Sequence, residues 1–163
     1  MTTAATAPER RSRSERRRTT VPPIVAELRT ALEQGDIDVL FQPQFAADDG
    51  RLVGAEALSR WTHPGLGVIG GDRLFAIAEQ GGLTEALSHR VARIALAAAR
   101  SWRAGLRLSL NVAAPDVLAA DFVSNIAAML AETRFSPACL TLEITEQVLL
   151  SDLGDTADKL RHL

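Results

Sequence analysis

Three residues with side-chain oxygens lie in short apolar runs that are typical of β-strands: Glu56, Asn111 and Glu143. Two carboxylates and an amide carbonyl are hard donors, which suit Mg²⁺ or Mn²⁺, whereas the lack of clustered His or Cys disfavours zinc. Arg60 follows Glu56 closely, and its planar guanidinium can bind a phosphate through two parallel hydrogen bonds. These residue types therefore indicate a cation site that handles a phosphate group.

Each of these residues also has an ordinary structural explanation. A glutamate in a strand can face water, an asparagine can cap the helix that follows it, and an isolated arginine is often solvated surface. The argument for a shared site is their common place toward the carboxyl ends of strands, because those ends gather at one edge of a parallel sheet. From spacing alone, a shared site and three unrelated residues both remain open.

The elements that must position these residues follow from hydrophobic periodicity and turn residues. Four apolar runs are expected to be strands: Ile37–Phe45, Leu52–Trp61, Leu106–Val112 and Leu140–Thr145. The turn-prone segment Asp48-Asp49-Gly50 separates the first two runs. Because helical patterns alternate with the strands, we expect an α/β fold of parallel βα units with right-handed crossovers.

Five helices are expected beside these strands. The first carries Ile24, Leu28 and Leu32 at four-residue spacing and ends at Gly35, where a glycine suits the C-terminal cap. The next two are 72–80 and 84–104. The fourth begins at Pro115, with a buried stripe that consists of Leu118, Phe122, Ile126 and Leu130. The last spans about 152–163 after Ser151, which is a suitable N-cap.

The charge of the chain is distributed unevenly, with six arginines against two glutamates in the first 20 residues. Residues 10–20 include no apolar side chain, so they cannot offset the entropy of ordering, and 1–20 is expected to be a disordered tail. Without interleaved aromatic residues, contact of this tail with nucleic acid is disfavoured. The single cysteine, Cys139, is expected to be a buried structural thiol.

The location of the protein can be predicted from segments that the sequence lacks. No stretch approaches the roughly 18 consecutive apolar residues of a membrane span. No apolar segment follows the N-terminal arginines, as it would in a secretory signal. The chain is therefore expected to be cytoplasmic.

Five motifs follow one another in a characteristic order. Glu56-Ala57-Leu58 is followed by Ser59-Arg60-Trp61 and His63-Pro64. The other four are Phe41-Gln42-Pro43-Gln44, Ala78-Glu79 with Gly82-Leu83, Asn111-Val112-Ala113, and Leu142-Glu143-Ile144-Thr145-Glu146. In content and order, the motifs resemble those of the EAL family of cyclic di-GMP phosphodiesterases, over residues 24–163.

The resemblance implies a (β/α)8 TIM-type barrel, of which the chain holds about the first four strands with their helices. It also implies hydrolysis of cyclic di-GMP to pGpG with two divalent cations, Mg²⁺ or Mn²⁺. By motif position, Glu56, Asn111 and Glu143 resemble metal ligands. Gln42, Leu58 and Arg60 resemble contacts to the dinucleotide. Glu146 resembles a glutamate that steadies an active-site loop from outside the ligand shell.

The sequence departs from the family pattern in two ways. Ala113 replaces the serine of the N-x-S motif, which removes a hydroxyl beside the expected ligand Asn111. The acidic loop, the lysine strand and the glutamate strand of the family's second half have no counterpart in the 163 residues. No catalytic acid or base is identified in this half, so the chain alone is expected to be inactive.

Two functional hypotheses remain. In the first, 24–163 is a truncated EAL domain whose motifs are those of a working phosphodiesterase. In the second, it is a non-catalytic EAL remnant that binds the dinucleotide or a protein. Four strands of a barrel would leave an open sheet edge and expose an apolar interior. We therefore expect poor solubility, a homodimer, or pairing with a complementary half-domain.

Overall fold

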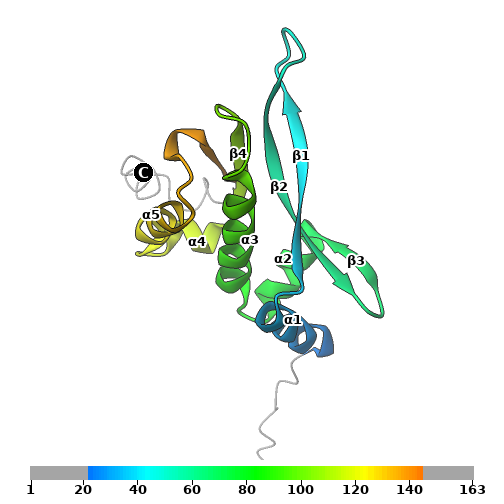
Figure 1. Cartoon of the computed structure of the whole chain (residues 1–163). Coiled ribbons are helices and arrows are strands. Elements are labelled where there is room, and N and C mark those ends of the chain that lie inside the picture. The colour runs from blue at the N-terminus through cyan, green and yellow to red at the C-terminus, as the bar shows by residue number, and fades with distance from the viewer. Residues whose placement is uncertain (1–21, 145–163) are drawn as a thin grey trace, which may run out of the picture.

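A computed structural model describes residues 22–144 of the chain, in which a five-stranded sheet carries helices on one face (Figure 1). The strands are β1 (Ile37–Phe45), β2 (Leu52–His63), β3 (Gly67–Gly70), β4 (Arg107–Val112) and β5 (Leu140–Ile144). The helices are α1 (Pro23–Gln34), α2 (Gly71–Gln80), α3 (Thr84–Ala99), α4 (Ala114–Leu118) and α5 (Phe122–Thr133), and a 3₁₀ turn spans Pro137–Cys139. The α/β fold class predicted from the sequence is confirmed.

The sheet has the order β1-β2-β4-β5, with β3 paired beside β2. β2, β4 and β5 run parallel to one another, as expected, but β1 and β3 each pair with β2 antiparallel. The expectation that the fold begins with parallel units was wrong, because only 46–51 connect β1 to β2. A connection of this length makes a hairpin, whereas parallel strands need a crossover of a dozen or more residues. β3 was not predicted, since it has four residues and two of them are glycine.

Two helices differ from their predicted extents. α3 ends at Ala99, five residues before the predicted end, because the backbone then tightens into turns in which Trp102 N–H donates to Ala99 O. The helix expected from Pro115 onward is divided into α4 and α5. Val117 faces the core at this break, while Leu118 of the predicted stripe is 39% exposed.

Each face of the sheet has its own chemistry, because side chains alternate along a strand. One face packs against the helices through a core that includes Ala57, Leu108, Leu110, Leu96 and Ile126. A second core joins α1 and α2 to Ile37, Trp61 and Ile69. By the strand register, the opposite face carries Asp38, Leu40, Gln42, Gln44, Glu56, Leu58, Arg60, Ser109, Asn111, Thr141 and Glu143. The expectation of an apolar interior was wrong for these strands, since this face is mostly polar.

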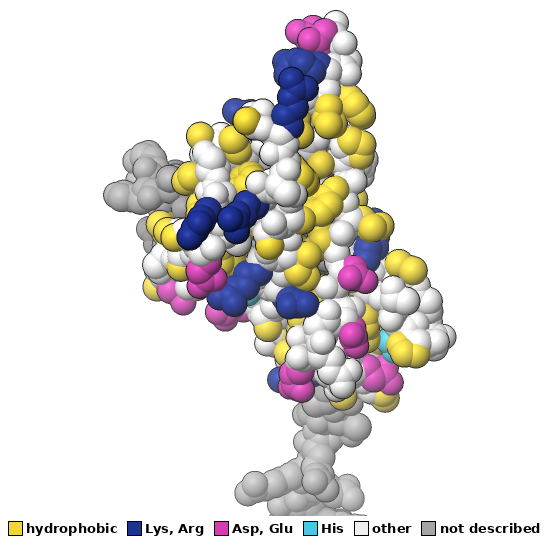
Figure 2. All heavy atoms as spheres, viewed as in Figure 1, with side chains coloured by type: hydrophobic (Ala, Val, Ile, Leu, Met, Phe, Trp, Pro, Cys, Tyr) yellow, Lys and Arg dark blue, Asp and Glu magenta, His cyan; other side chains and the backbone are white. Residues whose placement is uncertain are grey.

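The hairpin of β1 and β2 projects beyond the rest of the sheet (Figure 1). It carries three large apolar side chains that are exposed, namely Leu40, Phe45 and Leu52. Figure 2 shows hydrophobic side chains along this projection and acidic ones at its tip. Within 22–144, no helix is long and apolar enough to cross a membrane.

Several predicted features lie outside the described residues. These are the tail 1–20, Thr145, Glu146, and the final helix with its cap Ser151. The single cysteine, Cys139, is a free, half-buried thiol in the described part of the chain.

A close approach between β2 and β4 generates a prediction about Gly54. A Cβ atom at this position would lie 2.4 Å from the carbonyl oxygen of Arg107. We therefore expect Gly54→Ala to lower the free energy of unfolding by about 1–3 kcal/mol or more, as overpacking does. Denaturant unfolding followed by circular dichroism measures this change.

Gly65→Ala is the matched control for Gly54→Ala. The nearest atom to a Cβ at Gly65 is in the His63 ring, at 3.6 Å, so this substitution should alter the unfolding free energy by no more than about 0.5 kcal/mol. Equal stability of the two variants would contradict the close approach.

Candidate functional site

The parallel pairing between β2 and β4 ends just beyond Glu56. Its last pair is Ala57 with Leu110, after which β2 continues alongside β3. Glu56 is therefore in the middle of β2 rather than at its end, but it lies near the end of the parallel ladder. The end of the parallel ladder, rather than the end of the whole strand, marks the expected ligand-binding edge, because ligands bind at the carboxyl ends of parallel strands.

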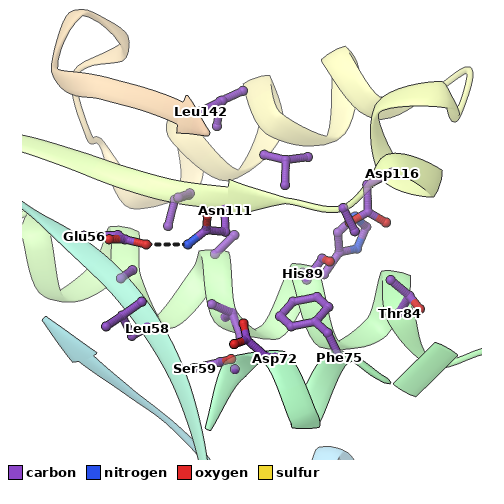
Figure 3. A pocket seen from close by; sticks show the side chains of 18 of the residues that line it. Glu56, Leu58, Ser59, Asp72, Phe75, Thr84, His89, Asn111, Asp116 and Leu142 are labelled. Atoms are coloured by element: carbon purple, nitrogen blue, oxygen red, sulfur yellow. Dashed lines mark hydrogen bonds between the residues drawn. The ribbon is translucent and has the colours of Figure 1, made fainter. Parts of the chain in front are cut away.

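Glu56 and Asn111 are brought together at this edge. Asn111 Nδ2 donates a hydrogen bond of 2.6 Å to Glu56 Oε1, and the two side chains point toward one another in Figure 3. Glu143 on β5 is the register partner of Asn111 on β4, so both side chains leave the same face of the sheet. Three predicted site residues thus lie on adjacent parallel strands.

The residues predicted to contact a dinucleotide lie on the same face. Leu58 and Arg60 follow Glu56 at alternate positions along β2, and Gln42 on β1 is its exposed register partner. Arg60 Nη1 donates to the carbonyl oxygen of Ser59 over 2.8 Å, which holds part of the guanidinium against the backbone. The arrangement places the cationic side chain of Arg60 two positions beyond Leu58. It lies close to the edge of the sheet that carries Glu56, Asn111 and Glu143, which we call the carboxylate edge.

A cleft of about 940 Å³ opens at this edge and extends between α2, α3 and α4. Glu56, Leu58, Arg60 and Asn111 line it. Its lining also includes polar residues that the sequence reasoning missed, namely Asp72, Thr84, Ser88, His89 and Asp116. In Figure 3, Thr84, His89 and Asp116 lie together, away from Glu56. The four-residue spacing of Thr84 and Ser88 on α3 was the only local sign in the sequence that polar side chains share one face there. Asp116 lies on a separate helix, α4, so its place in the cleft had no local sign.

The carboxyl of Asp116 is half-buried in the cleft, and this burial affects its ionisation. Burial raises the pKa of its carboxyl above the ordinary value of 3.8, and the charge of Glu85 acts in the same direction. The Ser88 hydroxyl, the His89 ring and a backbone hydrogen bond at Ala113 oppose this rise. Asp116 Oδ2 and Ser88 Oγ are buried, and their approach falls short of hydrogen-bond geometry.

The donor chemistry at the carboxylate edge fits a hard divalent cation. Within 22–144, no three His, Cys, Asp or Glu side chains converge as a metal site. The side-chain oxygen donors that share this edge on adjacent parallel strands are those of Glu56, Asn111 and Glu143. Because Nδ2 of Asn111 is turned to Glu56, its Oδ1 is presented to the other side as an oxygen donor. Two carboxylates and an amide oxygen are ligands that Mg²⁺ and Mn²⁺ accept.

Comparison with known proteins gives a consistent family relationship. A family model described as the EAL domain matches residues 25–163. Two curated proteins of Pseudomonas aeruginosa are similar to the chain: cyclic di-GMP phosphodiesterase NbdA, 34% identical over 141 residues, and cyclic di-GMP phosphodiesterase RocR, 31% identical over 144 residues. These matches cover 84% and 86% of this chain, but only 18% of NbdA and 37% of RocR. The chain therefore spans less than half the length of these relatives.

Solved structures show the same fold. A structure described as the PaMucR phosphodiesterase in complex with c-di-GMP superposes with a TM-score of 0.80 at 29% identity, covering 85% of this chain and 57% of that one. The FimX EAL domain of Pseudomonas aeruginosa bound to c-di-GMP superposes with a TM-score of 0.76 at 20% identity, over 86% and 57%. At the lower identity the likeness concerns the fold alone.

The buried carboxyl of Asp116 generates a prediction about pH. With a raised pKa, the folded state holds the proton more tightly than the unfolded state, so stability is lost as pH rises through the folded pKa. We expect Asp116→Asn to unfold with the same free energy as wild type below pH 3.8 and to become the more stable protein as pH rises above it. Urea unfolding at several pH values measures this difference.

Asp121→Asn is the control, because Asp121 is an exposed residue close by in the chain. Substitution at an exposed site away from the core should change the unfolding free energy by no more than about 0.5 kcal/mol. If the stability difference between Asp116→Asn and wild type does not change with pH, burial does not raise the pKa of Asp116 as the structure indicates.

Proposed function

Because this chain belongs to the EAL domain family, we propose that its carboxylate edge binds cyclic di-GMP together with Mg²⁺ or Mn²⁺, as part of a cyclic di-GMP phosphodiesterase domain over residues 24–163. The observation that carries the proposal is the 2.6 Å contact of Glu56 with Asn111 at the end of the parallel ladder. Its support from relatives is that NbdA and RocR are named as phosphodiesterases of this dinucleotide. The PaMucR structure, 29% identical to this chain, is a c-di-GMP complex.

Glu56, Asn111 and Glu143 are the residues that would hold the cation in this proposal. A bound divalent cation polarises a phosphodiester and lowers the pKa of a water, which is the chemistry of metal-assisted phosphate hydrolysis. The protein's part is to keep three oxygen donors on neighbouring strands, where the sheet fixes their spacing. Glu146, which lies outside the described residues, is assigned in the same proposal to support an active-site loop.

Arg60, Leu58 and Gln42 are assigned to the dinucleotide. The Arg60 guanidinium is already held by the Ser59 carbonyl, so little conformational freedom is lost when its other N–H groups meet a phosphate. Leu58 offers an apolar contact between Arg60 and Glu56, and Gln42 approaches the same face from β1. The proposal includes a cytoplasmic location, and a homodimer or a complementary half-domain as the protein partner.

A second candidate function is dinucleotide binding without hydrolysis. Within residues 22–144, the carboxylates on this edge of the parallel strands are those of Glu56 and Glu143. If both bind the cation, no other carboxylate at this edge is left to act as a general acid or base, and this favours binding without hydrolysis. The two functions are separated by incubating the chain with cyclic di-GMP and Mn²⁺ and following pGpG by chromatography. Formation of pGpG supports the phosphodiesterase, whereas dinucleotide binding that gives no product even after a complementary half-domain is added supports the binding module.

The cation site generates a prediction about Glu56. Loss of one carboxylate ligand removes a charge and an oxygen donor, so Glu56→Gln should weaken Mn²⁺ binding by at least the roughly 10–100-fold seen for supporting residues. Electron paramagnetic resonance of free Mn²⁺ measures the change. Glu33→Gln, at an exposed position of α1, should bind as wild type, and a normal Mn²⁺ affinity in Glu56→Gln would refute the ligand assignment.

The phosphate contact generates a prediction about Arg60. Lysine keeps the charge but lacks the planar pair of donors, so Arg60→Lys should weaken cyclic di-GMP binding by about tenfold or more. Isothermal titration calorimetry measures this affinity. Arg103→Lys changes an exposed arginine away from the sheet edge, and equal affinities for the two variants would rule out a bidentate contact by Arg60.

A further inference from the structure

Below the Glu56–Asn111 contact, which joins β2 and β4, a second polar contact on the same face spans three strands. The Gln44 side chain extends from β1 over β2 to reach Ser109 on β4. Ser109 Oγ lies 3.4 Å from both Gln44 Nε2 and Gln44 Oε1, so the hydroxyl can accept from one and donate to the other. These residues are 65 positions apart in the sequence, and β2 lies between their strands (Figure 1).

Gly54 is the reason that this contact can form. It is the register partner of both Gln44 on β1 and Arg107 on β4, and it presents no side chain to the face that Gln44 crosses. A Cβ at Gly54 would meet the Arg107 carbonyl at 2.4 Å, so β2 and β4 also come closer here than a larger residue allows. The missing side chain at Gly54 of β2 and the close approach of β4 to β2 together allow Gln44 to reach Ser109.

Ser109 is 3% exposed, and it is one of two buried polar residues in the described part of the chain. A buried hydroxyl without a hydrogen-bond partner is destabilising, and the Gln44 amide is the partner that the fold provides for Ser109. Gln44 is itself half-buried. The contact, a polar layer of the sheet, is therefore partly shielded from solvent at its Ser109 end.

This layer lies directly below the proposed cation site. Ser109 is the register partner of Glu56 and precedes Asn111 by two residues on the same face of β4. The two contacts are parallel diagonals, one from Gln44 to Ser109 and one from Glu56 to Asn111. Inward side chains from alternate strands form such layers in (β/α)8 barrels, and a polar layer under a ligand layer restrains the groups above it.

We propose that Gln44 and Ser109 are positioning residues that set the distance between the Glu56 carboxylate and the Asn111 amide, a role that rests on the proposed function of those two groups. Gln44 and Ser109 do not touch the cation or the dinucleotide in this proposal. They join β4 to β1 across β2, and Asn111 lies on β4 two residues beyond Ser109. Loss of the layer lets the end of β4 move relative to the hairpin of β1 and β2, which changes the environment of the Asn111 amide.

The test compares Gln44→Met, Ser109→Ala and the double variant with wild type, using the full chain. Nuclear magnetic resonance follows the side-chain NH₂ groups of asparagine in the metal-free protein. The sequence contains only two asparagines, Asn111 and Asn125, so Asn111→Asp assigns both signals. Free Mn²⁺ is measured in parallel by electron paramagnetic resonance. Gln34→Met, at the exposed end of α1, is the control for replacing a glutamine.

The proposal expects both single variants to move the Asn111 signal while Asn125 on α5 stays in place, and to weaken Mn²⁺ binding by roughly tenfold. The double variant should bind no more than about twofold worse than either single variant, because both substitutions break one contact. Unchanged Asn111 signals in Gln44→Met and Ser109→Ala overturn the proposal.

Failure of the proposed function is distinguishable from failure of this inference. If wild type does not bind Mn²⁺, the cation site is wrong, and the Asn111 signal alone decides whether the layer positions the amide. If Ser109→Ala is not folded by circular dichroism, Gln44→Met decides, because its unbranched side chain fills the same space without the hydrogen-bonding groups.

Discussion

The pairing of β2 with β4 covers only the register from Gly54–Arg107 to Ala57–Leu110, yet the other parts of the site depend on it. It is the first parallel contact of the sheet, and it determines which side chain of β4 stands beside Glu56. A shift by one residue would turn Asn111 to the helical face, because side chains alternate along a strand. Gly54 holds this register by allowing an approach that any Cβ would prevent.

One face of the sheet stabilises the fold, and the opposite face carries the residues of the proposed site. On the helical face, Leu96, Leu108 and other fully buried side chains supply the apolar contacts that stabilise the domain. The opposite face carries carboxylates, amides and hydroxyls, which contribute little apolar burial but present oxygen and nitrogen atoms in rows. The cleft includes residues of the carboxylate edge and also the half-buried Asp116, whose ionised form is disfavoured by burial.

Local features of the fold were predictable from the sequence. Strand Ile37–Phe45 matches its predicted bounds, and α1 ends at Gly35, which adopts a left-handed conformation with φ of 85°, because apolar period and cap chemistry are local. Strand direction was mistaken at β1, although the short connection 46–51 already indicated a hairpin. Glu56, Asn111 and Glu143 were singled out by type, and their adjacency follows from the parallel order. The contacts of Gln44 with Ser109 and of Asp116 with its neighbours were missed, since residues distant in sequence meet there only after folding.

The measurement that tests the central claim most directly is a crystal structure of the chain grown with cyclic di-GMP and Mn²⁺, with anomalous scattering recorded to locate the metal. The account predicts an anomalous peak at roughly 2.0–2.3 Å from oxygens of Glu56 and Asn111, a range near that of hard-cation ligands, and a phosphate of the dinucleotide against Arg60. Dinucleotide bound elsewhere on the chain, or Mn²⁺ held without Glu56 and Asn111, would contradict it.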